Sequence, residues 1–251
     1  MRDSIRRVLI AAAAAAMLSG CGFGSSPAGA FAAAGAPGVA SQASASRAGS
    51  WMLPEARGES LVYVSDTWDI GLVYVFSYPG GKHVGTLTGF YNPTGECVDK
   101  HGDVWVLNMS PEVIVEYAHG GTSPIATLDD PVGGFSCSID ATTGNLAIDS
   151  VDPAKVAVYA NAAGTPTVYT YSGAASLASC AYDGSGNLFI DSSNASRPFA
   201  ELPKGGNSFV EIKYPNDAPL GNMQWDGRYL AVQERTHGNQ GPITIDRVQV
   251  A

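Results

Sequence analysis

Positive charge is scarce in this sequence. Its 251 residues carry 14 Lys and Arg against 23 Asp and Glu, a formal net charge of −9 at pH 7. Three arginines and one aspartate lie within the first 20 residues, and without that segment the balance is 11 basic against 22 acidic residues, or −11. A surface this acidic repels phosphate backbones, and no basic cluster offsets it. The composition therefore excludes nucleic acid as a partner.

The sequence also lacks a long apolar run at its start. The run from Val8 to Leu18 has eleven residues, which is too short to span a bilayer comfortably but typical of an export signal. It follows three arginines and ends in Leu18-Ser19-Gly20-Cys21, which resembles the bacterial lipobox. We expect a lipoprotein signal peptide over residues 1–20, lipid attachment at Cys21, and a place in the bacterial cell envelope, at the outer membrane or cell surface. An ordinary signal peptide with a chance Cys, or a plain membrane anchor, is the alternative.

Bulky side chains are rare between residues 22 and 50, where Ala, Gly, Ser and Pro fill 24 of the 29 positions. Such a segment cannot bury enough apolar surface to offset the entropy lost on ordering. As a flexible coil it would span roughly 30 Å root-mean-square. We therefore expect residues 21–50 to form a lipidated tether and residues 51–251 to form the folded domain.

No stretch after residue 50 has the 3.6-residue period of an amphipathic helix, so the domain is predicted to be all-β. Five short apolar segments recur with starts separated by 42, 42, 42 and 41 residues: Leu61-Val62-Tyr63-Val64, Asp103-Val104-Trp105-Val106, Asn145-Leu146-Ala147-Ile148, Asn187-Leu188-Phe189-Ile190 and Arg228-Tyr229-Leu230-Ala231. Other β-branched or aromatic runs and Gly-bearing turns complete a unit of four strands. This period is that of a β-propeller blade. We predict a propeller of about five four-stranded units, rather than a β-sandwich or a β-helix.

The two ends of the repeat array are irregular. The first unit would take its first strand from Ser50–Glu55, although Pro54 cannot donate a ladder hydrogen bond. The last unit has strands near Asn222–Trp225 and Arg228–Gln233, and a third over Ile243–Val250. We expect an incomplete fifth blade with a gap or weak seam between it and the first. Alternatively, the chain is shorter than relatives that continue to six or seven blades.

The unit motif resembles that of the NHL and gluconolactonase-like (SGL) propellers. The segment Pro93-Thr94-Gly95-Glu96-Cys97-Val98-Asp99, followed by Gly102-Asp103-Val104-Trp105-Val106-Leu107-Asn108, is similar to their repeat, and Gly186-Asn187-Leu188-Phe189-Ile190-Asp191 matches its second half. Propellers of this kind serve many functions. The resemblance implies the fold and leaves three functions open: a binding or scaffold module, a metal-dependent lactonase- or lyase-like enzyme, or a structural envelope lipoprotein.

An enzyme of that kind needs a divalent ion held by carboxylates from several blades. The candidates are Glu96, Asp99, Asp140 and Asp183, but the three aspartates recur at one position of the unit beside a Gly turn, which favours turn capping. Glu96 is a single carboxylate on an expected inner strand. The sequence also has no Gly-x-Ser-x-Gly elbow of a serine hydrolase. We therefore predict no catalytic residue, metal or cofactor, and favour the binding or scaffold function.

Cysteine is scarce as well, and assigning Cys21 to lipid leaves Cys97, Cys137 and Cys180. Cys97 lies two positions before the aspartate of its unit and the other two lie three before, so Cys97 is on the opposite face of its strand. Buried Cys behaves as a small hydrophobe, and equivalent positions on adjacent blades usually stand too far apart for a disulfide. We expect three free thiols, with a disulfide between two of them as the alternative.

Recognition would fall to the loops that join the second to the third strand of a blade and those that join one blade to the next. These share one face of a propeller. Here they carry Trp68, Tyr91, Phe135 and Met109. Exposed apolar side chains on a rigid scaffold suit the binding of a peptide, glycan or small molecule. The alternative is that these side chains cap the edges of the blades.

Overall fold

The computed structural model describes residues 49–67, 71–192, 199–213, 220–235 and 243–250. The chain divides into two units, Met1–Ala40 and Ser41–Ala251, and all the described residues belong to the second. The predicted signal peptide, Cys21 and nearly all of the predicted tether therefore lie outside the described residues.

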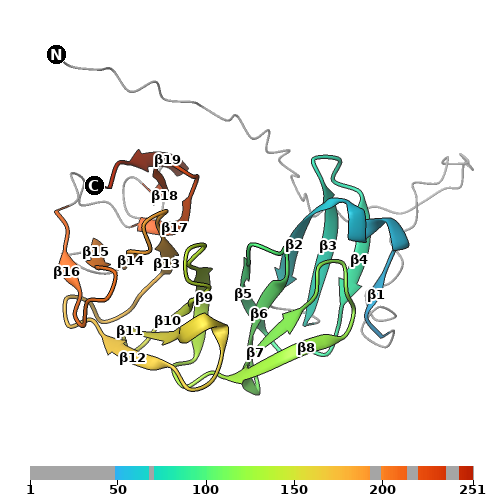
Figure 1. The fold of residues 1–251 in the computed structure, drawn as a ribbon, viewed down its shortest axis with the longest axis horizontal. Helices are drawn as coiled ribbons and strands as arrows, with labels where there is room; N and C mark the ends of the chain where they lie inside the picture. The colour runs from blue at the N-terminus through green and yellow to red at the C-terminus, as the bar shows by residue number, and fades with distance from the viewer. Residues whose placement is uncertain (1–48, 68–70, 193–198, 214–219, 236–242, 251) are drawn as a thin grey trace, which may run out of the picture. The chain divides into compact units, whose positions relative to one another are not determined.

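The described residues form five antiparallel sheets, four of four strands and one of three (Figure 1). Two short 3-10 helices, η1 (Pro54–Gly58) and η2 (Ala160–Ala162), lie between strands. The sheets, in chain order, are blade one with β1 (Trp51–Met52), β2 (Ser60–Asp66), β3 (Leu72–Tyr78) and β4 (His83–Leu87); blade two with β5 (Pro93–Val98), β6 (Val104–Met109), β7 (Glu112–Tyr117) and β8 (Pro124–Asp129); blade three with β9 (Gly134–Ile139), β10 (Leu146–Ser150), β11 (Lys155–Tyr159) and β12 (Thr167–Thr170); blade four with β13 (Ser179–Tyr182), β14 (Leu188–Asp191), β15 (Phe199–Leu202) and β16 (Val210–Glu211); and blade five with β17 (Leu220–Trp225), β18 (Leu230–Arg235) and β19 (Ile243–Val248).

The sheets follow one another around a common axis as the blades of a β-propeller. The first strands of consecutive blades lie side by side, β5 with β9, β9 with β13, and β13 with β17. The later strands of these blades run outward in chain order. The predicted all-β propeller of about five units is confirmed, and the fifth blade has three strands among the described residues.

An aspartate caps the turn between the first and second strands of blades two to five. Asp183, for example, accepts hydrogen bonds at Oδ1 from the backbone N–H of Ser185 (2.8 Å) and of Asn187 (2.9 Å). Equivalent bonds reach Asp99, Asp140 and Asp226. A glycine of positive φ follows in every case, Gly102, Gly144, Gly186 and Gly227. The predicted turn-capping role is therefore confirmed, since these carboxylates satisfy backbone donors that the turn leaves free.

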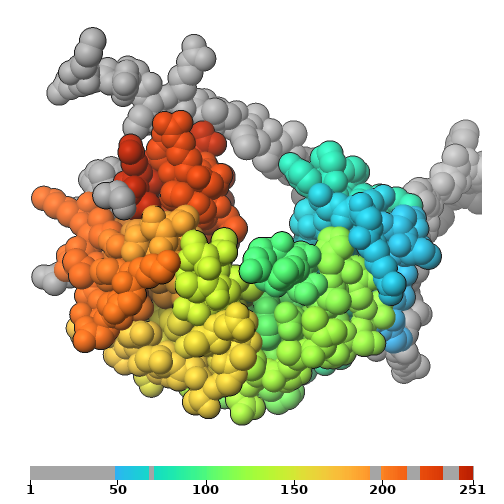
Figure 2. Space-filling view, in the orientation of Figure 1, coloured from blue at the N-terminus to red at the C-terminus, as the bar shows by residue number. Residues whose placement is uncertain are grey.

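Hydrophobic clusters fill the interfaces between consecutive blades. The pairs that meet are Val73 and Val75 with Val104 and Val106 (blades one and two), Trp105 and Leu107 with Leu146 and Ile148 (two and three), Ala147 and Val156 with Leu188 and Ile190 (three and four), and Ala181 and Phe189 with Met223 and Leu230 (four and five). Among the described residues no such cluster joins blade five to blade one. Figure 2 shows an open gap between the described residues of these two blades, which is the seam that the sequence predicts.

The first strand of blade one was predicted at Ser50–Glu55, and this prediction is wrong. Trp51–Met52 pairs instead with β4, at the outer edge of the sheet, and β2 forms the opposite edge (Figure 1). Pro54 starts η1, whose Ala56 is fully buried in the core between blades one and two. Because Pro54 cannot donate a ladder hydrogen bond, the chain leaves the sheet here.

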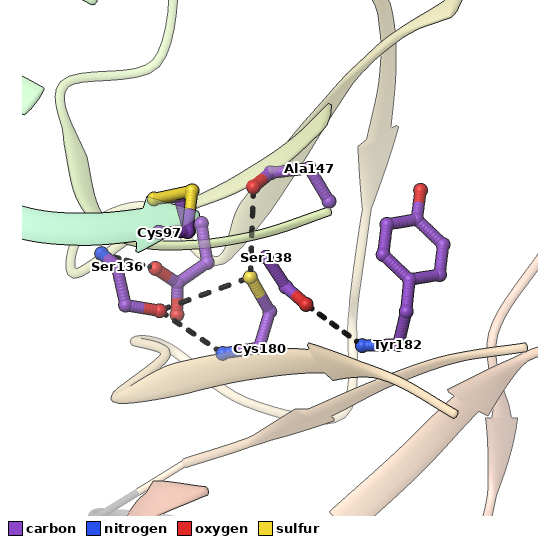
Figure 3. The surroundings of a disulfide bond; sticks show 8 residues. Cys97, Ser136, Ser138, Ala147, Cys180 and Tyr182 are labelled. Atoms are coloured by element: carbon purple, nitrogen blue, oxygen red, sulfur yellow. Dashed lines mark hydrogen bonds between the residues drawn. A yellow bond between two sulfur atoms is a disulfide. The ribbon is translucent and has the colours of Figure 1, made fainter. Parts of the chain in front are cut away.

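The expectation of three free thiols is also wrong, because Cys97 and Cys137 form a disulfide with a Cα–Cα distance of 5.7 Å (Figure 3). These residues lie on the neighbouring strands β5 and β9, and both join the core between blades two and three. Their opposite strand faces therefore point toward each other across that interface. Cys180 remains free and buried, with its Sγ 3.9 Å from the carbonyl oxygen of Ala147.

Alkylation of the denatured chain tests this pairing. Unfolding without a reductant is expected to expose one thiol of the three, that of Cys180, and prior reduction is expected to expose Cys97 and Cys137 as well. Peptide mass mapping of the alkylated sites measures both results. Labelling of all three residues before reduction would contradict the disulfide.

Candidate functional site

One face of the propeller gathers the connections named above, and we call it the loop face. It consists of the blade-to-blade connections at 88–92 and 130–133, the turns at 110–111 and 151–154 between second and third strands, and the strand ends beside them, with Met109 at the end of β6 and Phe135 near the start of β9. Backbone contacts hold neighbouring connections together: the N–H of Met109 donates to the carbonyl oxygen of Asn92 (3.3 Å).

Three of the four predicted binding residues lie on the loop face and are exposed: Tyr91 (65%), Met109 (46%) and Phe135 (42%). Trp68 lies outside the described residues. Val151 is exposed to a similar extent on the same face, in the turn after β10. Val151 is absent from the predicted binding residues, most of which are aromatic. Its position in a turn between second and third strands was the available signal.

Two buried polar side chains fix the backbone of the loop face. Asn108 accepts a hydrogen bond at Oδ1 from the N–H of Tyr91 (2.7 Å), and its Nδ2 donates to the carbonyl oxygens of Ser110 and Pro111. Asp130 accepts three backbone N–H groups, from Val132, Gly133 and Gly134. Because each bond restrains a connection rather than a strand, the exposed side chains are held on a pre-organised surface.

Two fully buried carboxyl groups lie beside this face, Asp149 next to the last residue of β10 and Asp191 at the end of β14, the second strands of blades three and four. Burial raises the pKa of Asp149 to about 6, although its Oδ1 accepts the N–H of Ser136 at 2.7 Å. Burial, reinforced by the charge of Asp149, raises the pKa of Asp191 well above its usual range. Burial therefore favours the protonated form of both carboxyl groups relative to an exposed Asp.

Glu96 lies in the interface between blades one and two. Ser65 of β2 supplies hydrogen bonds to it, while Oε1 is buried without a hydrogen-bond partner. Burial raises the pKa of this carboxyl group to about 7. Residues at the equivalent place in the next blades are Cys137, Cys180 and Met223, so Glu96 is the acidic member of a set of otherwise apolar positions.

A different group of carboxylates meets at the opposite end of blade two. Ligand atoms of Asp99, Asp103 and Glu116 all lie within 4.8 Å of one another, a spacing that could hold a metal ion. Asp99 and Glu116 also line a cavity of about 260 Å³ between blades two and three. Burial, followed by the charges of Asp103 and Asp99, raises the pKa of Glu116. This group was not predicted from the sequence, because Glu116 lies 13 positions after Asp103 and reaches the turn from the third strand of the blade.

The four carboxylates considered from the sequence do not form one site. Asp99, Asp140 and Asp183 cap three separate turns, and Glu96 faces Ser65 in another interface. In the part of the chain that the structure describes, the Asp99, Asp103 and Glu116 group is the one set of acidic, His or Cys ligands at metal-binding spacing. All three come from a single blade.

Similar solved structures support the fold of this chain but do not indicate its function. No protein-family model matches the chain, and no curated protein sequence matches it. The β-propeller domain of Cps50 (Swd1) from Myceliophteria thermophila is similar over 79% of this chain and 70% of its own, with 9% identity and a TM-score of 0.55. Hydrazine synthase from Kuenenia stuttgartiensis is similar over 76% of this chain and 56% of its own, with 15% identity and a TM-score of 0.57. At these identities the likeness shows a β-propeller fold alone.

Replacing Glu96 by Gln is expected to remove a pH dependence of stability. The folded protein holds a proton on Glu96 up to about pH 7, whereas the ordinary pKa of 4.5 applies when the chain is unfolded. The folded state is therefore most stable, with respect to this group, below pH 4.5. It loses on the order of 2–3 kcal/mol as the pH rises from about 4.5 to 7. The Glu96→Gln variant should lack this loss, so its advantage over wild type should grow across that window.

Urea unfolding at a series of pH values between 4.5 and 8 measures the effect. Glu112→Gln, which removes an exposed carboxyl group from the neighbouring β7, is the matched control and should follow wild type. If Glu96→Gln also followed wild type at every pH, Glu96 would have to be ionised in the folded protein.

Proposed function

We propose that this protein is a lipid-anchored β-propeller that works outside the cytoplasm as a binding module and that recognises its ligand with the loop face. The observation that carries the proposal is a set of exposed apolar side chains, Tyr91, Met109, Phe135 and Val151, on a face whose backbone is fixed by hydrogen bonds to the buried Asn108 and Asp130. Exposed apolar side chains on one face of a rigid scaffold are typical of a recognition site. A peptide, a glycan or a small apolar molecule fits this chemistry.

Two observations support a place outside the cytoplasm. The lipobox-like Leu18-Ser19-Gly20-Cys21 follows an apolar run of export-signal length. The disulfide between Cys97 and Cys137 is the second, since such bonds persist in oxidising compartments and are rare in the cytosol. Lipid attached at Cys21 would anchor the chain stably if two or more acyl chains were present.

No helix within the described residues has the length and apolar character needed to cross a membrane.

The enzymatic alternative has weaker support. Metal-assisted hydrolysis by a propeller of the resembled kind would use carboxylates from several blades around the axis. The carboxylates that meet at ligand spacing, Asp99, Asp103 and Glu116, belong to blade two, and two of them already accept backbone N–H groups. A purely structural envelope role is the other alternative. Detection of a ligand that binds the loop face would favour the proposal over it.

Changing Cys21 to Ser is expected to abolish lipid attachment. The unmodified protein should partition into the detergent phase of a two-phase extraction, and the Cys21→Ser variant into the aqueous phase, because the variant has no thiol to acylate. Immunoblotting of both phases measures the result. Equal partitioning of the two proteins would show that Cys21 is not the anchor.

Ligand recognition by the loop face can be tested with an array of short peptides and oligosaccharides. We expect wild-type protein to bind a subset of them, and Tyr91→Ala to weaken that binding by roughly tenfold or more, as removal of a central aromatic does at many interfaces. Tyr78→Ala is the matched control. Tyr78 is exposed to the same 65% but lies at the opposite end of its blade, where β3 ends before the turn to β4. Absence of binding to every probe would favour the structural role, and equal loss in both variants would exclude the loop face.

A further inference from the structure

The sheet of blade one is built differently from the others at its edge near the axis. The end of β2 lies beside the start of β5, because the Ser65 Oγ and Thr67 Oγ1 hydroxyls donate to the carbonyl oxygens of Thr94 (2.7 Å) and Pro93 (2.8 Å). Pro93 also pairs with Asn108, at the end of β6. β2 and β6 therefore run in the same direction, and β2 is the second strand of its blade, as the repeat spacing indicates.

In blades two to five the second strand pairs on its axial side with a first strand, β5, β9, β13 or β17. In blade one, among the described residues, β2 pairs with β3 alone, and no strand is paired to its axial edge, although at Ser65 the backbone and side chain hydrogen-bond to β5. Leu61 and Tyr63 pack toward blade two, so Val62 and Val64 lie on the other face of β2, where they are 41% and 45% exposed; Val104 and Val106 of β6 are fully buried against blade one. An unpaired edge presents a row of backbone N–H and C=O groups that can template a further strand.

We propose that this edge of β2 is a second binding site, independent of the loop face, which takes an extended segment of another polypeptide as the first strand of blade one. Addition of a strand to an exposed sheet edge is a recurrent mode of peptide recognition. The segment would lie antiparallel to β2, as the first strand of each other blade lies to the second.

The other blades define the chemistry of the segment that fits. Their first strands have four to six residues. One position of the first strand is a small residue in three of the blades: Gly95, Ser136 and Ser179. The position after it faces the preceding blade and carries a cysteine or methionine in three of the blades: Cys137, Cys180 and Met223. β5 of the next blade lies beside β2 on the axial side. The space at this edge is therefore wide enough for a single strand but not for the sheet of a folded partner.

The chain's own residues 22–48 are a poor match to this chemistry. Their larger apolar side chains, Phe23, Phe31 and Val39, are each eight positions apart, so no six-residue window holds two of them. The remaining positions are mostly Ala, Gly, Ser and Pro. The proposed occupant is therefore a separate polypeptide with alternating small and apolar side chains.

A fluorescent peptide that reproduces residues 177–183 with Cys180→Val tests the proposal on the full chain. We expect saturable binding by fluorescence anisotropy. A peptide with two alternate backbone amides N-methylated should bind more weakly by roughly five- to tenfold for each main-chain hydrogen bond lost. Hydrogen exchange locates the site: amides of Ser60–Asp66 should gain protection when the peptide is bound.

Matched variants separate strand addition from general adsorption. Val64→Lys places a charge beside the edge, a feature that blocks strand pairing in natural sheets, and should weaken binding by roughly tenfold. Val168→Lys, at a valine 43% exposed on β12, should bind the peptide as wild type does. Circular dichroism melts check that both variants fold.

Three results would overturn the proposal: no saturable binding up to about 1 mM peptide, equal binding of the N-methylated peptide, or protection at β19, the outer edge of blade five, in place of β2. None of these depends on Tyr91 or on lipid attachment, so failure here and failure of the loop-face proposal are distinguishable.

Discussion

A blade of this protein has two apolar faces and no means of covering either by itself. Each face is buried by the neighbouring blade, and the four clusters that result contain nearly all of the large side chains that are fully buried, such as Trp105, Tyr159 and Phe189. The free energy of folding therefore comes largely from the interfaces between blades, which are spread along the array, rather than from single sheets. The same dependence explains why the two ends of the array are its irregular places: each end blade has a neighbour on one side only among the described residues.

The inter-blade interfaces are not purely apolar, and their polar contents differ. A disulfide crosses the interface between blades two and three, while a carboxyl group with a raised pKa, Glu96, lies between blades one and two. Asp149 and Asp191 are buried toward the loop face. Groups of this kind cost stability when charged and buried, and proteins retain them at positions that matter for specificity or function. Asp149 accepts the backbone N–H of Ser136, next to the exposed Phe135, and so lies beside the loop face.

Much of this architecture follows from the sequence because it is periodic. The 42-residue spacing identified the second strands correctly, including β2, and the aspartates before each Gly turn proved to be turn caps. Non-periodic features were harder. The alternation of side chains along a strand correctly placed Cys97 and Cys137 on opposite faces of their blades. Adjacent blades present opposite faces to each other, however, so this difference brings the two cysteines together across the interface. Trp51–Met52 pairs with the outer strand β4, and a segment of two residues is too short to show a hydrophobic pattern that would predict this pairing. Burial of Asp149 and the approach of Glu116 to Asp99 are likewise products of packing between segments distant in sequence.

The two-residue strand β1 also bears on how the domain would respond to mechanical load. It is the first described strand after the predicted tether, and it is held at the rim of blade one by pairing with β4 at Trp51 and Met52. A pull transmitted along the chain from the N-terminal side acts on this short pair before it reaches β2, and detaching it leaves the strands β2, β3 and β4 still paired with one another. Met52 and Leu53 also pack against the core between blades one and two, so detachment of β1 would uncover part of that core as well as the edge of β4.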